Sequence, residues 1–260
     1  MVHTLLLKAV IGSLALDFFS FFSPANVAVE PEWSQDVIAT SSDFYDFLTV
    51  FLTEDGCVWD ISRDDAVKIK GLSNIVSVAA IYSSDAFAVD TDGMLWHWSY
   101  DQEDSSFVSE PQRVEDISDI KCVKTDRRNG TVFLITKDCE AYEYDLNENS
   151  MEKIMDNVAN MENAYILINS GDIYEMLYSY DAESGVSSRT IEQIYEASEP
   201  AKKAVEIRGR MEGLYFTTED GCSYFYDFYD SEEMHKMRNP FKIKKRFYPY
   251  GGRKALCIPV

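Results

Sequence analysis

The chain has 260 residues, of which 46% are apolar and 13% aromatic, so its composition excludes a disordered protein and allows one large domain or two small ones. Its formal charge is −21, from 45 acidic and 24 basic residues. This charge opposes binding to nucleic acid and to anionic membranes and favours basic partners, although high charge also serves solubility alone.

The charge is distributed unevenly. Residues 236–260 contain eight basic residues and no acidic one, so residues 1–235 carry a formal charge of −29. A strongly acidic body speeds encounter with basic proteins. The sequence leaves open whether the basic segment binds a partner or the acidic remainder of the same chain.

A short apolar run near the start resembles a signal peptide. It extends from Ala9 to Leu16 behind Lys8, and residues 24–28 have the small side chains of a cleavage region. Asp17 interrupts the run early, so we expect a cytoplasmic protein, with secretion as the alternative. No segment has the uninterrupted apolar length of a membrane span.

The cysteines indicate reduced thiols rather than disulfides or a zinc site, because their number is odd, no pair has the C-x-x-C spacing and no histidine lies near them. Cys257 occupies the place of a prenylation signal, behind several basic residues, which makes a lipid anchor a weak alternative. Against it, proline is unusual as the penultimate residue, and residues 255–258 suit a β-strand. The five cysteines are Cys57, Cys122, Cys139, Cys222 and Cys257.

One pentapeptide, Thr-Glu-Asp-Gly-Cys, occurs twice, at 53–57 and at 218–222. Each copy follows an apolar strand pattern and precedes an aromatic one. Asp-Gly between such runs predicts a β-hairpin with a type I′ turn, which needs positive φ at both central residues. Weaker versions of this pattern recur along the chain. The predicted hairpin turns lie near residues 12, 56, 93, 138, 171 and 221.

The segments between hairpins share a second pattern, seen at 67–80 and 111–123, in which a linker leads into a strand. The first of these strands ends in Val-Ala-Ala and precedes a hairpin that turns at Asp-Gly before a Trp-rich strand. This succession resembles the regulator of chromosome condensation repeat over essentially the whole chain. The chain departs from that family at Ile81 and Ser99, where glycines are expected. With only 12 glycines overall, several tight turns must be built without them.

The repeats predict an all-β protein, a single domain over 1–260 that forms a six- or seven-bladed β-propeller. Residues 242–260 would complete the last blade beside the N-terminal hairpin, and so close the ring and remove exposed sheet edges. A β-sandwich is the alternative, although its strands would not share linker patterns. We expect residues 178–203 to form a long loop, with helical composition only at 192–203, broken by Pro200.

The sequence contains no recognisable catalytic constellation. Of its three histidines, His97 lies between two tryptophans of a predicted strand and has no convergent nucleophile. Residues 90–93 resemble the start of a calcium loop, but Asp101 stands where a bidentate glutamate is needed, so we interpret them as a hairpin turn. We therefore predict no enzyme, no cofactor, no metal and no small-molecule substrate.

Aromatic residues in or beside predicted loops are the candidate binding residues, because aromatic anchors surrounded by charge are typical of interfaces. We expect an acidic face to capture a basic protein, as an inhibitor, immunity-type or regulatory protein would. The resemblance implies an alternative, nucleotide exchange on a small GTPase; an enzyme such as a hydrolase is a third possibility without support from a motif. The candidate residues are Trp33, Tyr178, Tyr180, Tyr195, Phe228 and Tyr229.

Overall fold

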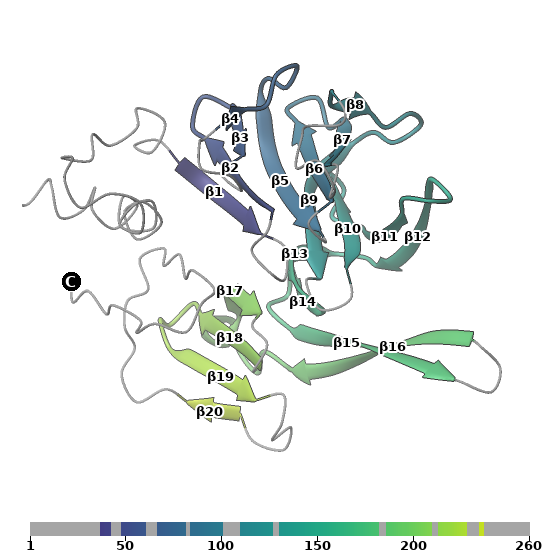
Figure 1. Cartoon of the computed structure of the whole chain (residues 1–260). Helices are drawn as coiled ribbons and strands as arrows, with labels where there is room; N and C mark the ends of the chain where they lie inside the picture. The colour runs from purple at the N-terminus through teal and green to yellow at the C-terminus, as the bar shows by residue number, and fades with distance from the viewer. Residues whose placement is uncertain are drawn as a thin grey trace, which may run out of the picture.

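The described residues form five four-stranded antiparallel sheets, arranged one after another along an arc (Figure 1). Each sheet is a meander of four consecutive strands and makes one blade of a propeller. The computed structural model describes residues 37–42, 48–60, 67–81, 84–100, 110–126, 130–181, 186–209, 213–227 and 234–236.

Blades one to three occupy the first half of the described chain. Blade one contains β1 (Val37–Ser42), β2 (Thr49–Thr53), β3 (Val58–Asp60) and β4 (Val67–Lys68). Blade two contains β5 (Ile75–Ile81), β6 (Asp85–Asp90), β7 (Leu95–Ser99) and β8 (Gln112–Arg113). Blade three contains β9 (Ile120–Asp126), β10 (Thr131–Thr136), β11 (Ala141–Asp145) and β12 (Ser150–Met155).

Blades four and five follow, with a short 3-10 helix between them. Blade four contains β13 (Val158–Glu162), β14 (Tyr165–Ile168), β15 (Ile173–Asp181) and β16 (Val186–Tyr195). The helix is η2 (Pro200–Lys202). Blade five contains β17 (Ala204–Gly209), β18 (Gly213–Thr218), β19 (Ser223–Asp227) and β20 (Met234–Lys236).

The first strand of each blade is the innermost, because β1, β5, β9, β13 and β17 contact the inner strands of neighbouring blades. The second strand lies between neighbouring blades and is buried on both faces in blades two to four. Residues 86–89 of β6 and 132–135 of β10 are therefore continuous apolar runs rather than alternating ones. A continuous apolar run in the sequence therefore indicates a strand that is buried on both faces.

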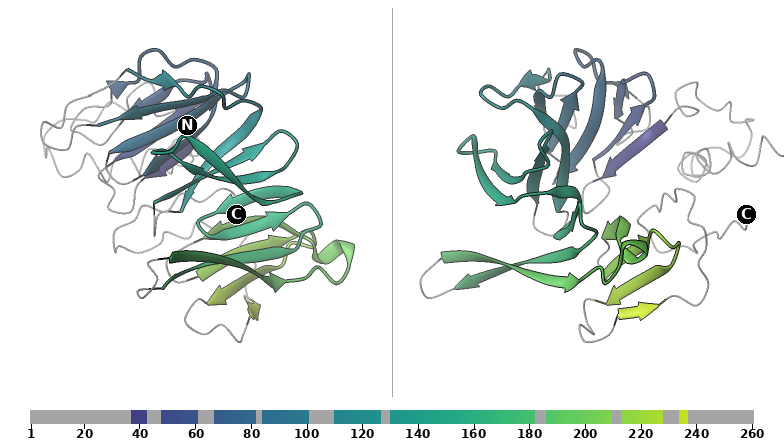
Figure 2. Two further views of the ribbon diagram at one scale, coloured as in Figure 1. Left: turned by 90° about the vertical axis from the view of Figure 1, so that its right-hand side faces the viewer. Right: turned by 180° about the vertical axis from the view of Figure 1, so that it is seen from behind.

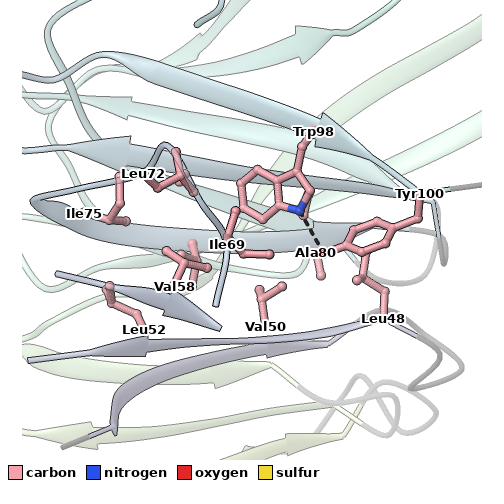
Figure 3. Close-up of a cluster of buried hydrophobic side chains, with 13 residues drawn as sticks. Leu48, Val50, Leu52, Val58, Ile69, Leu72, Ile75, Ala80, Trp98 and Tyr100 are labelled. Carbon is pink, nitrogen blue, oxygen red and sulfur yellow. Dashed lines mark hydrogen bonds between the residues drawn. The ribbon is translucent and has the colours of Figure 1, made fainter. Parts of the chain in front are cut away.

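The core between blades one and two shows how the sheets pack (Figure 3). Val50, Leu52 and Val58 of blade one meet Ile75 of β5 across the interface. Trp98 is fully buried there, and its indole Nε1 donates a hydrogen bond to the Tyr100 hydroxyl at 2.8 Å. The buried indole thus has the polar partner that a buried tryptophan normally needs.

The predicted hairpins at 56, 93, 138, 171 and 221 are confirmed, but the type I′ geometry is wrong. In the first, Gly56 N donates to Thr53 O, Thr53 N donates to Cys57 O, and only Gly56 has positive φ. This is a type I turn followed by a left-handed residue, the usual three-residue hairpin with a bulge. In blade three Cys139 takes the glycine position with φ +64, so that turn is built without glycine, as expected.

The turns of blades one to four also link each blade to the next one. The carbonyl of Gly56 accepts a hydrogen bond from Ile75 N, the first residue of the next inner strand, at 3.1 Å. Gly93 accepts likewise from Ile120 N at 3.0 Å, and Cys139 from Val158 N at 2.7 Å. These repeated bonds hold successive blades in one orientation.

Three expectations need correction. The described residues form five blades rather than six or seven, and the hairpin near residue 12 and the closing strands at 242–260 lie outside them. The loop expected at 178–203 is instead mostly the hairpin β15–β16, which extends outward beyond its blade (Figure 2). The expected helical composition yields only η2, because residues up to Tyr195 pair in the sheet.

Candidate functional site

One end of the arc collects the hairpin turns and the linkers that lead to each next inner strand. We call this end the turn face; it comprises turns 54–57, 91–94, 137–140, 169–172 and 219–222 and linkers 69–74, 114–119, 156–157 and 196–203. These segments contain fourteen acidic residues and four lysines. The acidic ones are Glu54, Asp55, Asp92, Glu115, Asp116, Asp119, Asp138, Glu140, Asp156, Asp172, Glu196, Glu199, Glu219 and Asp220.

Part of this acidity has a structural origin in the turns. Asp55 Oδ1 accepts hydrogen bonds from Thr53 Oγ1 and from Cys57 N, which fixes the turn. Asp90 does the same in blade two, where its Oδ1 accepts from the backbone N–H groups of Asp92 and Met94. Because an aspartate is useful in each of these turns, repeating the blade also repeats negative charge at one end of the molecule.

Exposed apolar side chains lie at the inner ends of the same face. Each inner strand has an irregular register at its second residue, and these five positions are Ile38, Val76, Lys121, Ala159 and Val205. Their exposed fractions reach 46% at Ile38, 48% at Val76 and 53% at Val205. β-Bulges redirect side chains in this way. We call these five the axial bulge residues; Ile38, Val76 and Val205 are exposed and apolar, whereas Lys121 is exposed and basic and Ala159 is partly buried.

Side chains crossing between inner strands keep the axial region in register. Ser77 Oγ accepts a hydrogen bond from Val123 N of the next blade, and the Ser41 hydroxyl accepts one from Ala80 N at 2.9 Å. Lys124 pairs with Glu162 of blade four at 3.1 Å. Burial alone would lower the pKa of Lys124, but the Glu162 carboxylate raises it above its ordinary value.

The lysines of the turn face neutralise only part of it. Lys202 pairs with Asp220, and this contact, with the Thr218 hydroxyl, holds the pKa of Asp220 well below its ordinary value. Lys137 Nζ donates to the Asp92 carbonyl rather than to a carboxylate, at 2.8 Å. Lys153 of β12 lies within 2.8 Å of Asp156.

The aromatic candidates from the sequence lie in different surroundings. Tyr178 in β15 is 38% exposed, and its hydroxyl donates to Glu143 of blade three at 3.1 Å. Burial and that carboxylate raise the pKa of Tyr178. Arg189 of β16 binds Glu143 and Glu152, which fastens the extended hairpin to blade three.

Tyr195 lies at the other end of that hairpin and packs between blades. Its ring centroid is 4.7 Å from that of Phe216, and its hydroxyl donates to the Lys202 carbonyl at 2.5 Å. Tyr180 belongs to β15. The remaining candidates Trp33, Phe228 and Tyr229 lie outside the described residues. The structure thus does not bring Tyr178 and Tyr195 together, and the binding role of these aromatics stays a prediction.

His97 of β7 is held by two residues of β6 in its own blade. Its Nε2 lies 2.7 Å from Asp85 Oδ1, and its ring stacks obliquely on Phe87 at 4.9 Å. Burial raises the pKa of Asp85, but the hydrogen bonds from His97 and Ser84 outweigh it and lower the pKa overall. The histidine therefore has a structural partner.

Within the described ranges, no group of three or more His, Cys, Asp or Glu side chains is placed to hold a metal ion. The four cysteines of that part of the chain are free thiols. A shallow surface hollow on blade five is lined by Arg208, Tyr215 and Tyr224, among others. No helix among the described residues has the length and apolar character needed to span a membrane.

Comparison with known proteins identifies the fold. No family model and no curated protein sequence matches the chain. Prp20p from Saccharomyces cerevisiae aligns with a TM-score of 0.53 and 14% identity over 74% of this chain and 61% of its own. Human WBSCR16 aligns with a TM-score of 0.54 and 12% identity over 79% and 65%. A structure of yeast RCC1 (Prp20) with Kap60 aligns with a TM-score of 0.49 and 14% identity over 71% and 55%.

These similarities define the class of the protein as an all-β propeller. The predicted resemblance to the regulator of chromosome condensation is confirmed for the fold, since Prp20p, the yeast RCC1, aligns with a TM-score of 0.53. The chain spans 61% and 65% of the length of the first two structures.

The axial bulge residues were not among the candidates from the sequence, which placed residue 76 only in the segment 67–80 where a linker leads into a strand. The available signal was a pair of adjacent apolar residues, such as Ile75-Val76 or Ala204-Val205, at the start of an inner strand. A regular strand alternates, so two consecutive apolar residues indicate either double burial or a bulge.

Proposed function

We propose that the chain is a non-enzymatic binding propeller whose turn face captures a basic protein, in the manner of an inhibitor, immunity-type or regulatory protein. The observation that carries this proposal is the exposed apolar side chains of Ile38, Val76 and Val205 next to the acidic turns and linkers of the turn face. Protein interfaces combine an apolar centre with a polar rim, and complementary charge on the rim accelerates encounter.

The structural neighbours are compatible with this role. Prp20p is described together with its binding to Gsp1p and to histones, and histones are basic proteins. At 14% identity this likeness concerns the fold, so histones serve as a probe of the proposed chemistry rather than as the named partner.

Core histones, titrated into the full chain by calorimetry at about 50 and 300 mM salt, test the proposal. We expect binding at low salt that weakens strongly at high salt, because rim charges are screened over about 10 Å at 0.1 M. An acidic protein such as serum albumin should show no binding. Histone binding of equal strength at both salt concentrations would contradict the electrostatic part of the proposal.

A second candidate function is nucleotide exchange on a small GTPase, which the likeness to a Gsp1p-binding propeller favours. Release of labelled nucleotide from a panel of small GTPases tests it. An accelerated release would support exchange, whereas unchanged rates would leave capture as the proposed activity.

A further inference from the structure

The last described strand of blade five ends at the turn face. β20 is the outer strand of that blade, and its last residue Lys236 lies opposite Tyr224, next to the β18–β19 turn. In blades one to four the chain continues from the outer strand along the turn face to the next inner strand, through linkers of two to eight residues. The residues after Lys236 therefore start at the turn face.

These following residues have the composition that suits this surface. Residues 237–247 contain five basic and no acidic side chains, alternating with apolar ones in the stretch Phe241-Lys242-Ile243-Lys244. The three linkers of six to eight residues, 69–74, 114–119 and 196–203, contain no, three and two acidic residues. An extended segment of eleven residues reaches roughly 36 Å, more than the shorter linkers need for the same path.

The surface offers matching features. The axial bulge residues expose apolar side chains at Ile38, Val76 and Val205, and the turns around them are acidic. Residues 237–247 therefore complement this surface in both charge and apolar character. Tethering raises the local concentration of such a segment to the millimolar range, so even a weak affinity keeps it bound.

We propose that residues 237–247 of this chain occupy the turn face as an internal ligand and compete there with an external basic partner. Occupancy itself is independent of any external partner, whereas the competition rests on the proposed function. The basic segment then acts as a regulatory element that must be displaced before a partner binds.

Zero-length crosslinking of the full chain with a carbodiimide tests occupancy. We expect amide links between Lys242, Lys244 or Lys245 and turn-face carboxylates such as Glu54, Glu115 or Glu219. These links should be intramolecular, as shown by a mixture of ¹⁴N- and ¹⁵N-labelled chains. Links mainly to Glu110 or Glu148 at the opposite end, links between differently labelled chains, or no links would each overturn the proposal.

Histone titration of paired variants tests competition. Lys244→Gln with Lys245→Gln should raise the affinity for core histones about threefold or more, because the tethered competitor is weakened. The matched control, Arg253→Gln with Lys254→Gln, removes the same charge from the chain outside residues 237–247 and should change affinity less. If both variants and the wild type bind histones with equal affinity, the proposed competition is wrong. The crosslinks then still show whether residues 237–247 occupy the turn face. If histones bind none of the three, the proposed function fails, and the crosslinks alone decide the occupancy.

Discussion

The two copies of Thr-Glu-Asp-Gly-Cys form the same turn in different surroundings. In both, the threonine hydroxyl donates to the aspartate Oδ1 at 2.6 Å, and the cysteine N–H donates to the same oxygen at 3.1 Å. Both glycines have positive φ, 75° at Gly56 and 77° at Gly221. Identical local sequence thus gives identical local structure.

Their packing differs. Gly56 is buried, and an added Cβ would lie 2.9 Å from the Asn74 Cα and 3.0 Å from Ile75 N of the next blade. Gly221 is exposed, and an added Cβ would meet no described atom within 4 Å. The pentapeptide determines the conformation of the turn, whereas its position among the blades determines which neighbouring residues the turn contacts.

The largest expected difference between the copies is at the glycines. Gly56→Ala forces a Cβ into the backbone of the next blade at positive φ, so we expect a loss of about 3 kcal/mol in the free energy of unfolding. Gly221→Ala should lower the free energy of unfolding by only about 1 kcal/mol, the cost of positive φ for alanine. Urea denaturation of both variants measures the two losses. Equal losses would show that the turns are not packed differently.

A smaller effect, and an equal one in both copies, is expected at the threonines. Thr53→Val and Thr218→Val each remove the hydroxyl that binds the turn aspartate, at a cost of about 1 kcal/mol. Both side chains are buried, so the shape of valine is accommodated. The same denaturation experiment applies; a loss confined to one copy would contradict the equivalence of the two turns.

The smallest effect concerns the aspartates. Lys202 lowers the pKa of Asp220, so this pair stabilises the fold at pH values above about 4, and its contribution disappears as pH falls through the lowered pKa. Lys202→Met should therefore raise the pKa of Asp220, measured by carboxyl NMR, and leave that of Asp55 unchanged. An unmoved Asp220 would show that the turn alone lowers its pKa.

Much of the fold could be predicted because its signals are local. The five hairpin turns follow from Asp-Gly, Asp-Cys or Ser-Gly sequences between apolar runs, and the turn hydrogen bonds join residues four apart or fewer. The small number of glycines likewise predicted that some tight turns lack glycine, as the turn at Cys139 does. Local chemistry is repeated faithfully from blade to blade.

The errors concern features that depend on neighbouring blades. The β15–β16 hairpin has a polar sequence that suggests a loop, and it is held by Arg189, whose partners Glu143 and Glu152 belong to blade three. The exposure of Val76 and Val205 results from a register irregularity against the adjoining strand, which no single strand sequence specifies. Tertiary context overrides local pattern at both places.

The most direct test of the central claim removes acidic charge from the turn face and measures histone binding by calorimetry. The test variant replaces Glu54, Glu115 and Glu219 together by glutamine. It should weaken binding at low salt on the order of tenfold, because each of the three lost surface ion pairs contributes about 0.5 kcal/mol. The matched control neutralises Glu110, Glu148 and Glu192, three exposed residues away from the turn face. The account predicts that the control binds like the wild type; equal weakening in both variants would contradict a specific role of the turn face.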